Sequence, residues 1–140
     1  MEDLIKFYEV LSDESLYSRF HTFGARNSIS RFLNHMGDNT NGRTWLVMYD
    51  DQNIVGDSSY FIERDSANVA ITIGDNYSGR GFGKQLFSEL ILTAKKENIK
   101  LFNLEILSSN QRMLNLLNHF GNPVLTSESN QIKYLDLDLN

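Results

Sequence analysis

The chain contains no cysteine. A disulfide scaffold, a thiolate metal site and a cysteine nucleophile are therefore excluded. It also has no apolar run near the roughly 20 residues that span a bilayer, and no basic segment followed by a hydrophobic stretch at its beginning. We therefore expect a cytoplasmic protein that does not bind membranes.

Positive charge is scarce as well. Lysine and arginine total 13 against 18 aspartates and glutamates, which gives a net charge of -5. This is the wrong sign for a protein that binds nucleic acid by neutralising phosphates. A basic target or an amine substrate suits such a chain better.

What remains is an ordinary globular composition. The 140 residues are 41% hydrophobic and 22% charged, which excludes collagen-like, low-complexity and wholly disordered classes. This length matches one domain with one core, and we expect residues 1–140 to form it.

The apolar spacing predicts two helices in the first part of the chain. Leu4, Phe7, Tyr8 and Leu11 recur at helical intervals, and Asp3 is the expected cap. A polar segment at residues 12–14 interrupts this pattern. A second amphipathic stretch covers residues 29–36.

From residue 44 onwards the pattern changes to that of a sheet followed by alternating helices and strands. Strand-forming residues alternate with polar turns, which predicts a three-stranded antiparallel meander. The expected strands are 44–49, 54–63 and 69–73, followed by a helix at 82–96, a strand at 100–107, a helix at 109–120 and a strand pair at 124–126 and 132–139.

A glycine-rich segment, Asp75-Asn76-Tyr77-Ser78-Gly79-Arg80-Gly81-Phe82-Gly83-Lys84, lies between a predicted strand and a predicted helix. The start of a helix offers unpaired N–H groups and a positive dipole end, and glycines let a phosphate approach the main chain. The segment therefore predicts a phosphate ligand. A tight turn without a ligand is the alternative.

Two common phosphate motifs do not fit this segment. A Walker loop requires glycine where Ser78 stands, and serine or threonine where Gln85 follows the lysine. The dinucleotide fingerprint requires glycine in place of Lys84 and a preceding βαβ unit rather than a meander.

The segment from Ser78 to Gly83 resembles the acetyl-CoA pyrophosphate loop of the GNAT superfamily of N-acetyltransferases, Gln/Arg-x-x-Gly-x-Gly/Ala, except at its first position. The order of predicted helices and strands resembles that superfamily over nearly the whole chain. Leu11–Phe20 and Asn110–Leu114 are similar to the acetyltransferase domain of prokaryotic protein lysine acetyltransferases.

The resemblance implies an α+β fold, in which helices flank a mixed, mainly antiparallel central sheet. The usual first strand is missing, since Met1 leads directly into the first helix. The sheet edge left there can be tolerated, covered or paired in a homodimer.

The resemblance also implies an activity. The expected enzyme is an N-acetyltransferase that moves acetyl from acetyl-CoA, its co-substrate, directly to a primary amine without a metal. The expected acceptor is a protein lysine or N-terminal amine. The alternatives are a small-molecule amine acceptor, or an acyl-CoA-binding sensor that has lost catalysis.

Several cofactor contacts follow from the resemblance. Backbone amides from Gly79 to Lys84, which we call the glycine loop, would hold the pyrophosphate, and the side chains of Arg80 and Lys84 would add charge. The strand before the loop would bind the pantetheine arm through its main chain. Asn110 either caps its helix or contacts that arm. The expected cofactor-binding residues are Ile71, Thr72, Ile73, Gly79, Arg80, Gly81, Phe82, Gly83, Lys84 and Asn110.

Acetyl transfer requires a neutral amine, and a free lysine has a pKa of about 10.4. Glu105 is the leading candidate for the catalytic base, because strand alternation puts it on a polar face with Asn103. Ribosomal-protein N-terminal acetyltransferases of the superfamily carry a glutamate at the matching offset. Lysine acetyltransferases of the closer type have it where Asn68 stands, which leaves Glu63 and Asp65 as alternatives.

Many members of the superfamily protonate the departing thiolate with a tyrosine seven residues after the asparagine that starts the helix. Counting from Asn110 gives Leu117, so this acid is missing. Tyr60, Tyr77 and Tyr134 are the substitutes that the chain offers. Its three histidines lack the paired spacing of a zinc site.

Overall fold

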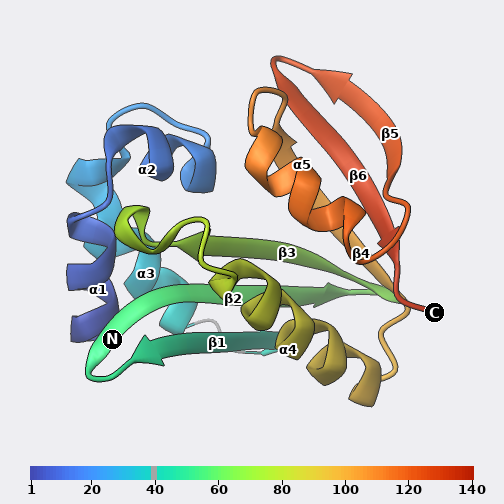
Figure 1. The fold of residues 1–140 in the computed structure, drawn as a ribbon, viewed down its shortest axis with the longest axis horizontal. Coiled ribbons are helices and arrows are strands. Elements are labelled where there is room, and N and C mark those ends of the chain that lie inside the picture. The colour runs from blue at the N-terminus through green and yellow to red at the C-terminus, as the bar shows by residue number, and fades with distance from the viewer. Residues whose placement is uncertain (39–40) are drawn as a thin grey trace.

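The computed structural model describes residues 1–38 and 41–140. Helices and strands alternate along the chain much as the sequence predicts (Figure 1). In order they are α1 (Glu2–Glu9), α2 (Asp13–Phe20), the 3-10 helix η1 (Ala25–Ser28), α3 (Ile29–Asp38), β1 (Arg43–Asp50), β2 (Asn53–Glu63), β3 (Ser66–Ile73), the 3-10 helix η2 (Asp75–Tyr77), α4 (Phe82–Lys96), β4 (Leu101–Leu107), α5 (Gln111–Asn118), β5 (Val124–Ser129) and β6 (Ile132–Asp138).

The strands of the described residues form one sheet in the order β1-β2-β3-β4-β6-β5. Every neighbouring pair is antiparallel except β3 and β4, which run parallel. The structure therefore has the mixed, mainly antiparallel sheet that the sequence predicts. No strand precedes β1 among the described residues, and β1 is an edge of the sheet.

The parallel pair holds together over only part of its length. Ser66 to Val69 of β3 pair with Leu101 to Leu104 of β4, and the pairing then stops. Beyond that point the half of the sheet formed by β1–β3 and the half formed by β4–β6 diverge toward the side on which α2 and α5 lie (Figure 1).

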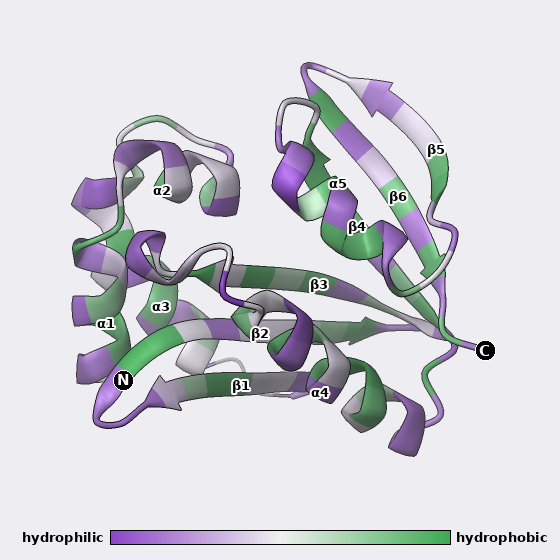
Figure 2. Cartoon of the chain, viewed as in Figure 1, coloured by the Kyte–Doolittle hydropathy of each residue, from purple (hydrophilic) through white to green (hydrophobic). Residues whose placement is uncertain are grey.

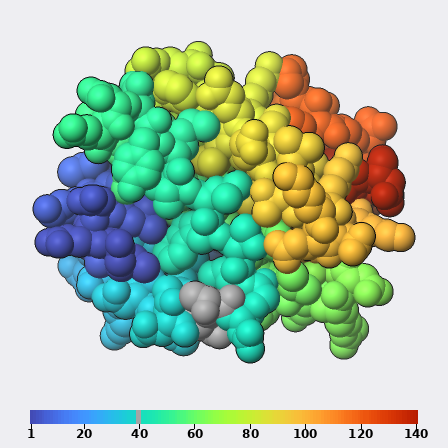
Figure 3. Space-filling view, turned by 90° about the horizontal axis from the view of Figure 1, so that it is seen from below, coloured from blue at the N-terminus to red at the C-terminus, as the bar shows by residue number. Residues whose placement is uncertain are grey.

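Helix α4 covers one face of the sheet. Its stripe of Leu86, Phe87, Leu90 and Ala94 is buried because it packs on apolar side chains of β2, β3, β4 and β6. In Figure 2 the ribbon of α4 changes between green and purple along its length, as expected for a helix with one buried side. Seen from below, α4 and β1 form much of one side of the molecule, with α1 and the C-terminal segment at its two ends (Figure 3).

Helices α1 and α3 build a second core on the opposite face. Leu4, Tyr8 and Leu33 are buried there, and Trp45 of β1 packs against them. The Tyr8 hydroxyl donates to Oδ1 of Asp57 at 2.6 Å, and the Trp45 indole N–H donates to Oδ2 at 2.7 Å. Both oxygens of this buried carboxylate therefore have hydrogen-bond donors, which offsets part of the cost of burial.

The N-terminal region differs from the prediction at a helix cap and by one additional helix. Asp3 does not cap α1, because the helix already begins at Glu2 and Asp3 lies within its first turn. The first helix does end before residue 12, but Ser12 also caps a further helix that was not predicted, α2, by accepting a hydrogen bond from the Ser15 N–H at 3.1 Å.

Candidate active site

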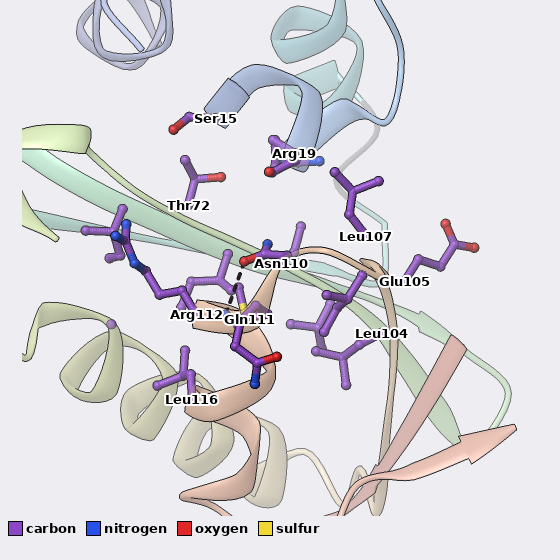
Figure 4. Close-up of a pocket in the computed structure, with 18 of the residues that line it drawn as sticks. Ser15, Arg19, Thr72, Leu104, Glu105, Leu107, Asn110, Gln111, Arg112 and Leu116 are labelled. Carbon is purple, nitrogen blue, oxygen red and sulfur yellow. Dashed lines mark hydrogen bonds between the residues drawn. The ribbon is translucent and has the colours of Figure 1, made fainter. Parts of the chain in front are cut away.

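A cleft of about 1730 Å³ opens where β3 and β4 diverge. The floor and sides are formed by the C-terminal parts of these two strands, and α2, the glycine loop and the start of α5 complete the wall. Figure 4 shows this arrangement, with Arg112 and Glu105 reaching to opposite ends. The cleft thus exists because a parallel pairing ends early.

The main chain of β3 is directed into this opening. The Gly74 N–H donates to the Val55 carbonyl at 2.8 Å, so the main-chain groups of Gly74 point toward β2. Because these groups alternate sides along a strand, those of Ile71 and Ile73 point the other way, to the side that β4 has left. These two residues thus offer main-chain donors and acceptors to a ligand, as a pantetheine arm requires.

Thr72 is oriented differently from its neighbours. The same alternation directs its main-chain groups toward β2, and its buried hydroxyl lies 3.3 Å from the Tyr8 hydroxyl, whose single proton is donated to Asp57. A cofactor contact by Thr72 stays a prediction. Its observed partners connect the cleft floor to the buried Asp57 beneath it.

The glycine loop is shaped for close approach to its backbone. Gly79 and Gly81 have φ angles of 77° and 84°, values that residues with a Cβ rarely adopt. A Cβ added at either position would have no atom within 4 Å, and both residues line the cleft. Gly81 is the N-cap of α4, and no side chain caps this helix. The first N–H groups of α4 are therefore left for a ligand, and the loop fits a phosphate group.

The two basic residues of the loop face different surroundings. Lys84 lines the cleft. The Arg80 guanidinium lies over the rings of Tyr77 and Phe82, 5.6 and 5.1 Å from their centroids, and neither Arg80 nor Phe82 is among the residues that line the cleft. Of the two cations, Lys84 is therefore the one that the structure places at the cleft, and a role in phosphate binding stays a prediction for both side chains.

Helix α5 begins at the wall of the cleft with Asn110. The Asn110 side chain accepts a hydrogen bond from the Met113 N–H at 3.2 Å, drawn as a dashed line in Figure 4. The capping role is therefore confirmed. Asn110 also lines the cleft, and its amide nitrogen has no hydrogen-bond partner among the described residues, so a cofactor contact stays open as a prediction.

Glu105 lies on β4 at the other end of the cleft. It shares a sheet face with Asn103, pairs across the sheet with Tyr134 and is exposed. Its carboxylate has no hydrogen-bond or ion-pair partner within residues 1–38 and 41–140. Glu105 is thus free to accept a proton from a group in the cleft.

Glu63 and Asn68 form a second polar group at the rim. The Asn68 amide donates to a Glu63 carboxylate oxygen at 2.9 Å, and both residues line the cleft. Asp65 lies in the turn between β2 and β3 and is not among the lining residues. Of the two alternative bases, the structure therefore brings only Glu63 to the cleft.

A family model described as the acetyltransferase (GNAT) family matches residues 4–121 of the chain. The chain belongs to this family. It is 28% identical over 116 residues to Acetyltransferase Pat of Mycolicibacterium smegmatis, an alignment that covers 79% of this chain and 34% of Pat. The GNAT chain therefore spans about a third of the length of that relative.

Solved structures agree with this assignment. The GNAT domain of S. lividans PAT matches with a TM-score of 0.82 and 25% identity, over 98% of this chain and 84% of that one. A PaiA N-acetyltransferase from Thermoplasma acidophilum, solved in complex with coenzyme A, matches with a TM-score of 0.79 and 16% identity, over 98% and 91%. The predicted GNAT-like fold and the likeness to prokaryotic protein acetyltransferases are confirmed.

The GNAT chain has no tyrosine at the position that often supplies the general acid. Leu117 is fully buried in the core. Of the three substitutes, only Tyr77 lines the cleft. Tyr60 is buried and donates a short hydrogen bond to Glu97, and burial together with this bond raises the pKa of Tyr60 to about 12.

Helix α2 is fastened to the loop region by Asp75, a connection that the sequence analysis missed. The Asp75 carboxylate accepts from the Ser12 N–H at 2.8 Å and from the Ser15 hydroxyl at 2.5 Å. Partial burial acts to raise the pKa of Asp75, but these hydrogen bonds and the nearby Arg112 charge lower it by more. The pKa of Asp75 therefore lies below its ordinary value. One wall of the cleft is thereby tied to the segment that carries the glycines.

Two negative observations concern only residues 1–38 and 41–140. They contain no group of three or more histidine, cysteine, aspartate or glutamate side chains that could hold a metal ion. None of their helices combines the length and the apolar character required to cross a membrane.

Proposed function

We propose that the chain transfers acetyl from acetyl-CoA directly to a primary amine of a protein, either a lysine side chain or an N-terminal amine. The observation that carries this proposal is the cleft at the divergence of β3 and β4. One end of this cleft has a loop that fits a phosphate group, and the other end has the Glu105 carboxylate, which has no partner among the described residues. Membership of the GNAT family and the similarity to Pat support it.

When bound, acetyl-CoA supplies an activated acetyl thioester. We assign the pyrophosphate to the backbone amides from Gly79 to Lys84, with charge from the Lys84 side chain. The main chain of Ile71 and Ile73 binds the pantetheine arm, and Asn110 adds its side-chain amide. This arrangement would direct the reactive end of the donor along the cleft toward β4.

Glu105 acts as the general base. A lysine ammonium must lose a proton before its nitrogen can attack, which costs about 5 kcal/mol at pH 7 for a pKa near 10.4. The Glu105 carboxylate accepts that proton, directly or through a water molecule in the open cleft. Its freedom from other partners favours this role over Glu63, which is already engaged by Asn68.

No protein group is required to protonate the departing thiol. Leu117 has no proton to give. A thiol resembling that of cysteine has a pKa of about 8.5 and leaves readily, and water in the open cleft supplies the proton.

The test is release of free coenzyme A with lysine-bearing peptides, peptides with a free N-terminus, and polyamines. We expect turnover with the peptides. Glu105→Gln should lower kcat by about 100-fold or more. The matched control, Glu89→Gln, changes an exposed glutamate on α4 that does not line the cleft and should leave kcat unchanged. Turnover by Glu105→Gln equal to that of the parent enzyme between about pH 6 and 9 would exclude Glu105 as the base.

A binding domain without catalysis is the second candidate, favoured by Asn68 in place of a glutamate and by the buried Leu117. Calorimetry with acetyl-CoA distinguishes the two. Tight binding without turnover on any of the three acceptor classes would favour the sensor. A single domain over residues 1–140, a cytoplasmic location and pairing of two copies at the β1 edge stay predictions.

A further inference from the structure

We propose that Arg112, which lies on α5 outside the glycine loop, binds the pyrophosphate of the donor and so selects thioesters that carry this group. The inference rests on the proposed function, because it concerns which acetyl donor the same cleft binds.

Arg112 lies at the cleft beside the glycine loop. Arg112 is the second residue of α5 and lines the cleft, and its Nη1 donates to the Ser78 hydroxyl at 2.8 Å. Ser78 directly precedes Gly79, the first glycine of the loop. In Figure 4 the Arg112 side chain extends away from Glu105. The guanidinium is therefore already positioned at the loop end of the cleft.

Most N–H donors of the Arg112 guanidinium bind no described residue. A guanidinium has five N–H donors in a planar fork, a geometry that matches two phosphate oxygens at once. The Arg112 side chain is exposed, and its bond to Ser78 is the only hydrogen bond it makes within residues 1–38 and 41–140. The other donors are available to a ligand without loss of a protein contact.

A bound pyrophosphate requires positive charge at this end of the cleft. A pyrophosphate diester carries two negative charges, and the start of a helix such as α4 contributes only about half a positive charge. Lys84 lines the cleft at this end, whereas Arg80 lies over aromatic rings outside it. Lys84 and Arg112 each bring a positive charge to this end of the cleft, and the nearby Asp75 carboxylate balances part of the Arg112 charge.

Ser78 occupies the first position of the loop motif. The loop pattern has a long polar or basic side chain at this place, and here a short hydroxyl stands instead. Arg112 reaches that hydroxyl from another element. A donor without a pyrophosphate, such as acetyl-pantetheine, would leave Arg112 without a ligand.

The experiment compares Arg112→Ala with the parent enzyme. We expect the Kd for coenzyme A and for 3′-dephospho-coenzyme A to rise by about ten-fold or more, because each loses a charge-assisted contact. The KM and kcat for acetyl-pantetheine should not change. Arg112→Lys, which keeps the charge but not the fork, should give an intermediate Kd.

Arg31→Ala is the matched control. The Arg31 guanidinium also donates to a serine hydroxyl, that of Ser28, at 3.0 Å, but neither residue lines the cleft. This variant should bind coenzyme A like the parent. Without ligand, both arginine variants should have Tm values close to that of the parent, and coenzyme A should raise the Tm of Arg112→Ala less.

Three results would overturn the inference. An equal loss with acetyl-pantetheine would make Arg112 a structural contact between α5 and the loop. A loss with coenzyme A but not with its 3′-dephospho form would assign Arg112 to the 3′-phosphate. An unchanged Kd would remove it from the site. If the parent chain itself does not bind coenzyme A, the proposed function fails first, and that outcome is seen before any variant is compared.

Discussion

Gly81 gives the sharpest test of where the cofactor phosphates lie. Its φ of 84° and ψ of 1° lie in the left-handed region, which costs a residue with a Cβ about 1–2 kcal/mol. Because no atom lies within 4 Å of an added Cβ, Gly81→Ala brings no steric clash within the described residues. We expect the variant to fold with a Tm about 3–8 °C lower.

The effect on binding should be much larger than the effect on folding. The added methyl group would occupy the side from which a phosphate approaches the first N–H groups of α4. Loss of one charge-assisted hydrogen bond corresponds to about 1.5–3 kcal/mol, so the Kd for coenzyme A should rise about 10- to 100-fold. Isothermal titration calorimetry measures it, and thermal unfolding measures stability on the same samples.

Gly24 supplies the control for backbone strain. It has nearly the same conformation, with φ 75° and ψ 13°, it also caps a helix, and an added Cβ would meet nothing within 4 Å. It does not line the cleft. Gly24→Ala should lose a similar amount of stability and keep the parent Kd. If the two variants bind coenzyme A equally well, the phosphates do not lie on the glycine loop.

Two further predictions concern buried and anchoring carboxylates. Asp75 has a lowered pKa in the folded state, so its stabilising effect is present above the unfolded value of about 3.9 and is lost as the pH falls through the folded value. Asp75→Asn should therefore lower the Tm at pH 7 and reduce the change in Tm between about pH 5 and 2; an unchanged acid profile would contradict this. Burial raises the pKa of Asp57, and the Tyr8 hydrogen bond counteracts this rise. Tyr8→Phe should lower the free energy of unfolding by about 2 kcal/mol at pH 7. The loss should be smaller at pH 4, because a raised Asp57 pKa destabilises the fold only as the pH rises above the unfolded pKa of Asp57. Urea titrations that give equal losses at both pH values would show the reasoning to be wrong.

The sequence predicts the sheet and α4 well, because their signals are local. The alternation of residues 100–107 assigns Phe102, Leu104 and Ile106 to the buried face and Glu105 to the polar one, as the structure confirms. The glycine loop is equally local, since its position between a strand and a helix can be read directly.

Helix α2 escapes prediction because its apolar pattern is weak. Of its residues, only Leu16 is buried, and the flanking serines read as a break. What fixes α2 is Asp75, about sixty residues away in the sequence, whose carboxylate binds Ser12 and Ser15. A contact at that separation leaves no trace in local spacing.

For the same reason, neither the cleft nor the position of Arg112 can be predicted from the sequence. The apolar run of β3 predicts a central strand, which it is, but side-chain pattern does not reveal where a parallel neighbour stops pairing. Arg112 comes together with Ser78 only through the fold of α5. The one signal that could have found it was the short side chain at the first position of the loop motif, since a missing donor there calls for one from elsewhere.

The early end of the β3–β4 pairing should also be detectable by hydrogen–deuterium exchange. The amide hydrogens of Ile71 and Ile73 lie in the middle of the sheet, yet they face the side on which β4 no longer runs, and no other described residue accepts from them. They should exchange with heavy water far faster than those of Ala70 and Thr72 beside them, which β2 holds. Two fast amides within a slow strand would thus report on whatever molecule fills the gap, without any chemical tag.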